Sequence, residues 1–132
     1  MKKVIRALLM SMLAISFTGW AGVKSSEKSA YHKISPQEGK QMLEKEKDIT
    51  LIDVRTPEEF NAGHIKNAIL IPDYELDTKI ASVVKDKSKK IITYCRSGMR
   101  SRTSARKLVE MGYENVNDMG GIMSWPFEIV ED

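Results

Sequence analysis

The chain is poor in the residues that build cross-links and metal sites. Its 132 residues include one cysteine and two histidines. A single cysteine cannot form a disulfide within the chain, and three such side chains are too few for the usual metal-ligand clusters. No glycine-rich nucleotide fingerprint is present either. We therefore expect no metal ion and no bound cofactor. A chemical role explains the lone thiol better than a structural one.

Positive and negative charges balance over most of the chain. Lys and Arg number 21 against 18 Asp and Glu, a net charge of +3. Lys2, Lys3 and Arg6 account for this difference, because the first 22 residues contain no acid. The one long basic run, residues 96–107, has five basic residues and no acid. It lacks the interleaved aromatic residues typical of nucleic-acid binding, so we expect no nucleic-acid partner.

Long hydrophobic runs are also absent. The run at residues 7–17 is mostly apolar, but it is shorter than the roughly 20 residues that a membrane-spanning helix needs. A basic start precedes it and small residues follow it, as in a secretory signal peptide. We predict a signal peptide at residues 1–22, a tether at 23–30 and one domain at 31–132. The expected location is the periplasm, with no stable membrane insertion after cleavage.

Helix and strand signals alternate along the predicted domain. Ser35-Pro36 and Thr56-Pro57, each followed by a glutamate, match the capping box that begins a helix. Short apolar strands are predicted at residues 50–54, 68–71, 90–94 and 116–119, and further helices at 74–84 and 101–111. This alternation predicts an α/β fold, with a central parallel sheet of about five short strands and helices on both faces.

The only cysteine directly follows the strand predicted at residues 90–94. Ligands of α/β sheets bind beyond the carboxyl ends of strands. A tight turn there can point several N–H groups inward, Gly98 permits unusual dihedral angles, and Arg96 and Arg100 add positive charge. Such a setting favours a thiolate. We predict Cys95 as the catalytic nucleophile and a substrate-binding loop of Arg96, Ser97, Gly98, Met99 and Arg100.

Each feature of this loop has an ordinary explanation when taken singly. A lone cysteine after an apolar strand is often an inert buried residue, and arginines at a helix start often face solvent. Their combination around Gly98 favours the anion cradle. Among the other candidates, we interpret His64 as packing, His32 as a surface residue and Trp125 as core.

Several motifs, in order, resemble the rhodanese (thiosulfate sulfurtransferase) domain. They span nearly the whole predicted domain and comprise LIDVR at 51–55, PEEF at 57–60, GHI at 63–65, CRSGMRS at 95–101, and Gly120-Gly121 with Trp125. The resemblance implies that Cys95 takes sulfur from thiosulfate as a persulfide and passes it to cyanide or a thiol. The implied partners are small sulfur anions and such an acceptor. Asp53 and Arg55 would support the loop, although an ordinary ion pair at a strand end is an equally good interpretation.

Two other functions compete with this one. Cys-dependent phosphatases use a similar cradle, but the four residues between Cys95 and Arg100 are one fewer than in their loop. The shorter loop suits a sulfur atom better than a phosphate. A non-catalytic sulfur carrier would need the same cradle as an enzyme, so the sequence leaves that alternative open.

Overall fold

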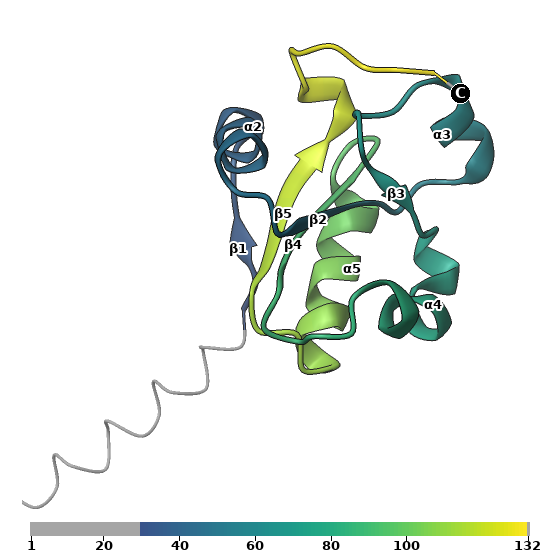
Figure 1. The fold of residues 1–132 in the computed structure, drawn as a ribbon. Coiled ribbons are helices and arrows are strands. Elements are labelled where there is room, and N and C mark those ends of the chain that lie inside the picture. The colour runs from purple at the N-terminus through teal and green to yellow at the C-terminus, as the bar shows by residue number, and fades with distance from the viewer. Residues whose placement is uncertain (1–29, 132) are drawn as a thin grey trace, which may run out of the picture. The chain divides into compact units, whose positions relative to one another are not determined.

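The computed structural model describes residues 30–131; the predicted signal peptide and residues 23–29 of the predicted tether lie outside the described residues. A five-stranded parallel sheet with the order β1-β5-β4-β2-β3 forms the centre of residues 31–131 (Figure 1). The strands are β1 (His32–Lys33), β2 (Ile49–Asp53), β3 (Ile69–Leu70), β4 (Lys90–Cys95) and β5 (Val116–Gly121). The predicted α/β class with a parallel sheet is confirmed.

Two helices begin where their sequence signals predict. In α2 (Pro36–Lys45), the Ser35 hydroxyl accepts from the N–H of Glu38 at 3.0 Å. In α3 (Pro57–Ala62), the Thr56 hydroxyl accepts from the N–H of Glu59 at 3.2 Å. Both capping boxes are complete, which explains why these helices start at a proline. Among residues 30–131, no helix is long and apolar enough to cross a membrane.

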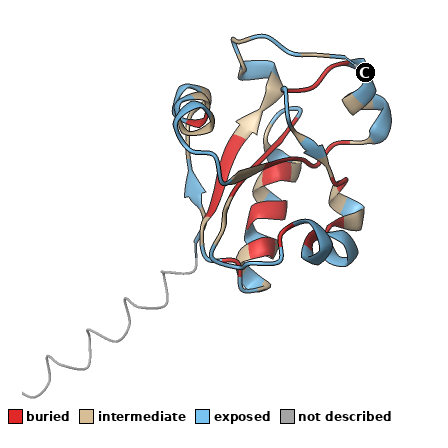
Figure 2. Cartoon of the chain, viewed as in Figure 1, coloured by how far each residue is buried: buried red, intermediate tan, exposed pale blue. Residues whose placement is uncertain are grey.

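The remaining helices complete two layers over the sheet. α4 (Leu76–Val83) and α5 (Met99–Glu110) cover one face, where Ile52, Ile91 and Leu108 belong to the buried core (Figure 2). α2 packs on the other face, over a second buried cluster that includes Ile92 and Tyr94. The predicted covering of both faces is therefore confirmed. Successive residues of β4 alternate between the two cores, as the pleat of a strand requires.

Three elements differ from the sequence-based expectation. The helix expected from residue 74 starts with a short 3-10 turn, Asp73–Glu75, and becomes α4 only at Leu76. The helix expected from residue 101 begins two residues earlier, because Gly98 with φ +112° caps it and directs the chain straight into α5. β1 was not placed in advance, since its two exposed residues carry no apolar pattern and pair only with β5.

The carboxyl ends of three strands meet at one edge of the sheet. Asp53 of β2 is opposite Tyr94 of β4, and Cys95 is opposite Gly121 of β5. The register between β4 and β5 shifts after Thr93, so that β5 has one extra residue there. This irregularity brings the two glycines at the end of β5 beside the chain that leaves Cys95.

Candidate active site

Cys95 ends β4 at the floor of the loop, with 1% of its surface exposed. Its side chain belongs to the core beneath α4 and α5. The backbone N–H of Gly98 donates to the Sγ of Cys95 over 3.0 Å. The predicted turning of a loop N–H toward the sulfur is therefore present at Gly98. A donor in this position favours negative charge on the sulfur atom.

Glycines allow the loop to close tightly. Gly98 has φ +112° and ψ −14°, a left-handed conformation that is costly for residues with a Cβ. On the neighbouring strand, a Cβ at Gly121 would lie 2.6 Å from the Cα of Ser97 and still closer to the carbonyl oxygen of Arg96. The N–H of Met123 donates to that carbonyl over 3.2 Å. The end of β5 therefore forms a wall against which the loop is held.

A buried serine links the loop to this wall from below. The Ser101 hydroxyl lies 3.2 Å from the carbonyl oxygen of Gly98 and 3.4 Å from that of Gly120. The Asp118 carboxylate in turn accepts from the N–H of Gly120 over 3.1 Å. Ser101 thus lies within the first turn of α5, and Gly98 is the residue at the cap position.

Arg100 is held in a two-point ion pair with Glu59. Its Nη1 donates to Oε1 over 2.9 Å and its Nη2 to Oε2 over 3.0 Å. The hydrogen bond from Arg100 is the main reason why the pKa of Glu59 falls to about 2. The same contact chiefly raises the pKa of Arg100, with a smaller contribution from the charge of Cys95. Sequence reasoning missed Glu59, because its place in the capping box already explained it.

Asp53 and Arg55 form a second two-point ion pair, almost wholly buried. Nε of Arg55 donates to Oδ1 of Asp53 over 2.9 Å, and Nη2 donates to Oδ2 over 2.7 Å. Nη2 also donates to the carbonyl of Gly63 over 2.8 Å. Burial lowers the pKa of Arg55, but its hydrogen bond to Asp53 and the charge of that residue outweigh burial and raise it. The pair ties β2 to the chain that follows α3.

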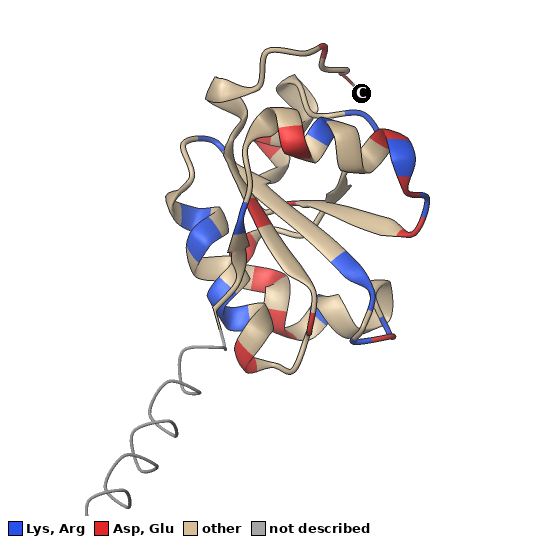
Figure 3. Cartoon of the chain, turned by 90° about the vertical axis from the view of Figure 1, so that its left-hand side faces the viewer, with Lys and Arg blue, Asp and Glu red and all other residues tan. Residues whose placement is uncertain are grey.

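The outer side of the loop faces solvent. Arg96, Ser97 and Met99 are exposed, and the Arg96 side chain has no ion pair among residues 30–131. The structure thus gathers the predicted loop at one strand end, while Arg100 faces Glu59. Basic and acidic residues are otherwise interspersed over the face that Figure 3 shows.

A hollow of about 380 Å³ lies beside the loop. Its charged lining includes Arg55, Glu59 and Arg96, and its apolar lining includes Met123 and Trp125. A larger hollow of about 480 Å³ lies next to α2 and contains no residue of the cysteine loop. A third hollow, of about 230 Å³, is lined by Ser97, Gly98 and Met99 of the loop, so the loop borders a hollow on each of two sides.

Three residues that were not predicted to belong to the site are His64, His32 and Trp125. His64 is buried and stacks on Phe60 with ring centroids 3.7 Å apart, and His32 is exposed, as expected. Trp125 is only half-buried; it packs on the second core cluster but also lines the hollow beside the loop. It is therefore not purely a core residue. Within residues 30–131, no group of three or more His, Cys, Asp or Glu side chains is placed to hold a metal.

Comparisons with known proteins identify the family of this chain and several relatives. The family model described as "Rhodanese-like domain" matches residues 35–126. A protein named "Sulfurtransferase" from Allochromatium vinosum is 34% identical over 95 residues, which cover 71% of this chain and 87% of the relative. "Thiosulfate sulfurtransferase PspE" from Escherichia coli is 41% identical over 71 residues, 54% of this chain and 68% of that protein. The solved structure described as "rhodanese with anions from E. coli" superposes with a TM-score of 0.61 at 36% identity, covering 64% of this chain and 99% of that one.

Proposed function

The chain belongs to the rhodanese-like domain family, and we propose that this rhodanese-type sulfurtransferase moves the outer sulfur of thiosulfate to cyanide or a thiol through a persulfide on Cys95. The observation that carries the proposal is the Gly98 N–H aimed at the Sγ of Cys95 over 3.0 Å. That donor favours the anionic form of the Cys95 sulfur, which is the form that attacks the sulfur donor.

The proposed reaction has two steps. The Cys95 thiolate attacks the outer sulfur of thiosulfate, a sulfur–sulfur bond forms to the enzyme, and the bond to the sulfonate sulfur breaks with its electron pair leaving as sulfite. Cyanide or a thiolate then attacks the terminal sulfur and restores the Cys95 thiolate. Because the chain has a single cysteine, no second thiol of its own can resolve the persulfide. The two half-reactions predict ping-pong kinetics.

The residues around Cys95 have distinct roles in this proposal. Arg96, Ser97, Gly98, Met99 and Arg100 form the substrate-binding loop. Arg96 offers an exposed positive charge to the incoming anion, whereas the loop N–H groups stabilise the charged sulfur. Asp53 and Arg55 act indirectly, by fixing the end of β2 beside the loop.

The test is a sulfur-transfer assay on residues 23–132 of the wild type and of the Cys95→Ser variant. We expect the wild type to form thiocyanate from thiosulfate and cyanide, and the variant to form none. After thiosulfate alone, the intact mass of the wild type should increase by one sulfur atom, and cyanide should remove it. A sulfur adduct that no acceptor removes would identify a carrier. Hydrolysis of p-nitrophenyl phosphate without any reaction with thiosulfate would instead support the phosphatase.

We also propose that the protein is exported to the periplasm. The basic start, the short apolar run and the small residues at 19–22 support this proposal. Expression of the full chain in a Gram-negative host should yield a periplasmic protein whose intact mass corresponds to loss of about the first 22 residues. Retention of the full mass in the cytoplasmic fraction would contradict it.

A further inference from the structure

The three arginines near the loop, Arg55, Arg96 and Arg100, differ in whether a carboxylate balances their charge. Arg55 is paired with Asp53, and Arg100 is paired with Glu59. Arg96, which follows Cys95 directly, has no ion pair among residues 30–131. Two of these three arginines are therefore balanced by a carboxylate, and Arg96 is the one that is not.

The carboxylate of Glu59 is held in place by contacts other than its ion pair with Arg100. Its Oε1 accepts from the backbone N–H of Thr56 over 3.0 Å and lies 3.1 Å from the Thr56 hydroxyl. These contacts anchor the carboxylate to the start of α3. Both partners of the ion pair remain partly exposed, 33% for the Arg100 side chain and 26% for Glu59, and Glu59 lines the hollow beside the loop. The pair is therefore close enough to a bound donor to act on its charge.

We propose that Glu59 determines the charge preference of the site for its sulfur donor. By balancing Arg100, it leaves Arg96 as the uncompensated cation of the loop. This arrangement favours singly charged donors of sulfane sulfur, such as organic thiosulfonates, more than a site without Glu59 would. Thiosulfate carries two negative charges and would gain more from a second free cation. The inference rests on the proposed sulfur transfer and names the donor class of the same site.

The chemistry is the same for both donors. With a thiosulfonate, the Cys95 thiolate forms a bond to the outer sulfur, and the sulfur–sulfur bond of the donor breaks with its electron pair leaving as a sulfinate. The total charge is conserved, and no oxidant or reductant is needed. A comparison of the two donors therefore measures the effect of donor charge at one site, because the mechanism is the same for both. The low pKa of Glu59, about 2, keeps its carboxylate charged throughout the neutral range.

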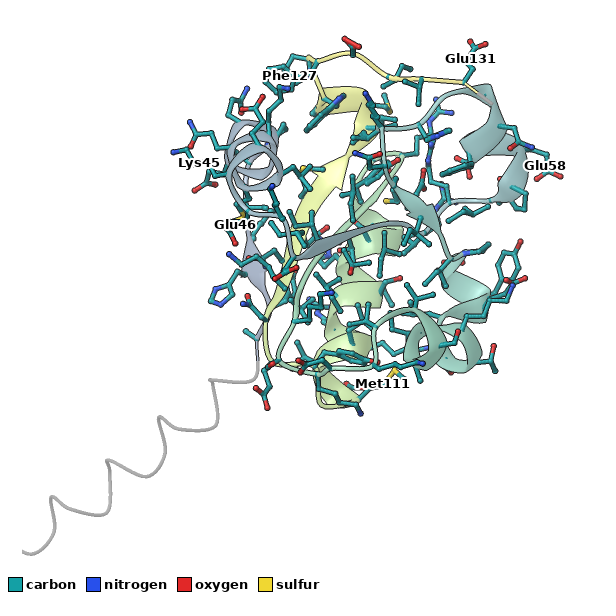
Figure 4. The ribbon with its side chains drawn as sticks, in the orientation of Figure 1. Lys45, Glu46, Glu58, Met111, Phe127 and Glu131 are labelled. Carbon is teal, nitrogen blue, oxygen red and sulfur yellow. The ribbon has the colours of Figure 1, made fainter. Side chains whose placement is uncertain are left out.

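The experiment compares Glu59→Gln with two matched controls. Glu58→Gln removes the same charge from the neighbouring position of α3, whose side chain points away from the sheet (Figure 4). Glu38→Gln alters the equivalent capping box of α2, where the glutamate accepts from the N–H of Ser35 over 2.8 Å. For each folded variant, kcat/KM is measured with thiosulfate and with benzenethiosulfonate, using cyanide as acceptor.

In Glu59→Gln, we expect the ratio of kcat/KM for thiosulfate to that for benzenethiosulfonate to rise about 3- to 10-fold. This is the effect of one extra unit charge a few ångströms from the ligand in a partly solvated site. The rise should appear mainly in KM and shrink at high salt. Glu58→Gln and Glu38→Gln should keep the wild-type ratio. An unchanged ratio in folded Glu59→Gln, or an equal rise in Glu58→Gln, would overturn the inference.

Loss of the arginine provides the reverse test. Arg100→Gln leaves Glu59 uncompensated, so the same ratio should fall about 3- to 10-fold. The double variant Glu59→Gln/Arg100→Gln contains neither charge, and its ratio should return to within about twofold of the wild type. A purely structural role of Glu59 as a helix cap predicts no such compensation. If the single Glu59 variant does not fold, Arg100→Gln and the double variant still decide the question.

Alkylation of Cys95 separates this inference from the sulfur-transfer proposal. Iodoacetate is an anion and iodoacetamide is neutral, and the chain has one cysteine to modify. The ratio of their rates should rise in Glu59→Gln by a similar factor and stay constant in Glu58→Gln. If the wild type transfers no sulfur but the alkylation ratio shifts, the proposed function fails and the charge balance stands. If sulfur transfer occurs and neither ratio shifts, the charge balance fails alone.

Discussion

The backbone N–H of Gly98 lies 3.0 Å from the Sγ of Cys95 and donates to it. This contact exists because Gly98 adopts φ +112°, which turns the chain back over the sulfur before α5 begins at Met99. A main-chain donor held by a helix start cannot rotate away as a side chain can. In the proposed reaction, a negative charge on this sulfur is stabilised by a group that is already oriented before any substrate binds.

Replacement of Gly98 by alanine should therefore cost both stability and activity. A Cβ in the left-handed region is unfavourable by about 1–2 kcal/mol, and relaxation of that strain would move the N–H away from Sγ. We expect a lower Tm in Gly98→Ala and a fall in kcat/KM for thiosulfate of at least about 10-fold. Gly112→Ala is the control, because Gly112 also has a positive φ, +100°, but lies beyond the far end of α5. It should lose similar stability and retain activity; equal activities in the two variants would contradict the role of the Gly98 N–H.

A second prediction concerns Gly121, which limits the loop by contact alone. Its φ of −109° is ordinary, so alanine would introduce no backbone strain. The added Cβ would instead meet the main chain of Arg96 and Ser97. Displacement of the loop by about 1 Å can reduce turnover by as much as about 100-fold, and we expect a loss of about 10- to 100-fold in kcat/KM for Gly121→Ala.

The neighbouring glycine separates this contact from backbone strain. Gly120 has φ +90°, but a Cβ there would meet nothing within 4 Å. Gly120→Ala should lower the Tm yet keep more activity than Gly121→Ala. The opposite order of activities would show that strain in β5, and not its contact with the loop, controls the site.

The fold was predictable where local signals decide it. Ser35 and Thr56 fix the starts of α2 and α3 through bonds made within three residues, and such short-range contacts leave a pattern in the sequence. The start of α5 depends instead on the conformation of Gly98, which closes the loop against β5. β1 exists only because it pairs with β5. Neither feature has a local pattern from which it could be read.

The same distinction holds for the site. Cys95, Gly98 and the loop arginines lie within six residues, and their clustering indicated an anion cradle. The partner of Arg100 is Glu59, 41 positions away along the chain and on a different helix. Because the capping box already explained Glu59, nothing else in the sequence indicated that it also contacts the loop. Only the packing of α3 beside the start of α5 reveals the ion pair.

The buried pair of Asp53 and Arg55 supports a prediction about stability. Both side chains are at most 6% exposed, so removal of one partner leaves an uncompensated buried charge. Arg55→Met should lower the free energy of unfolding by about 3–5 kcal/mol, measured by urea denaturation. The double variant Asp53→Leu/Arg55→Met should recover much of that loss, because no charge then remains buried.

An exposed pair serves as the reference for this measurement. Lys90 contacts Glu46 over 2.8 Å, with side chains 23% and 44% exposed. Lys90→Met should cost no more than about 1 kcal/mol, since water compensates the remaining carboxylate. If Arg55→Met costs as little as Lys90→Met, the inner pair does not support the end of β2.

The final prediction follows from the lowered pKa of Glu59. Its ion pair with Arg100 reduces that pKa from 4.5 to about 2. A carboxyl whose pKa is lower in the folded state adds stability above its unfolded pKa and loses it as the pH falls toward the folded value. The excess Tm of the wild type over Glu59→Gln should therefore be constant from neutral pH to about pH 5, and should shrink between pH 4.5 and 2. Thermal unfolding of both proteins in low-salt buffers across this range measures it, with Glu58→Gln as the charge-matched reference. A difference that stays constant down to pH 2 would mean that the excess stability does not come from the charge of the Glu59 carboxylate.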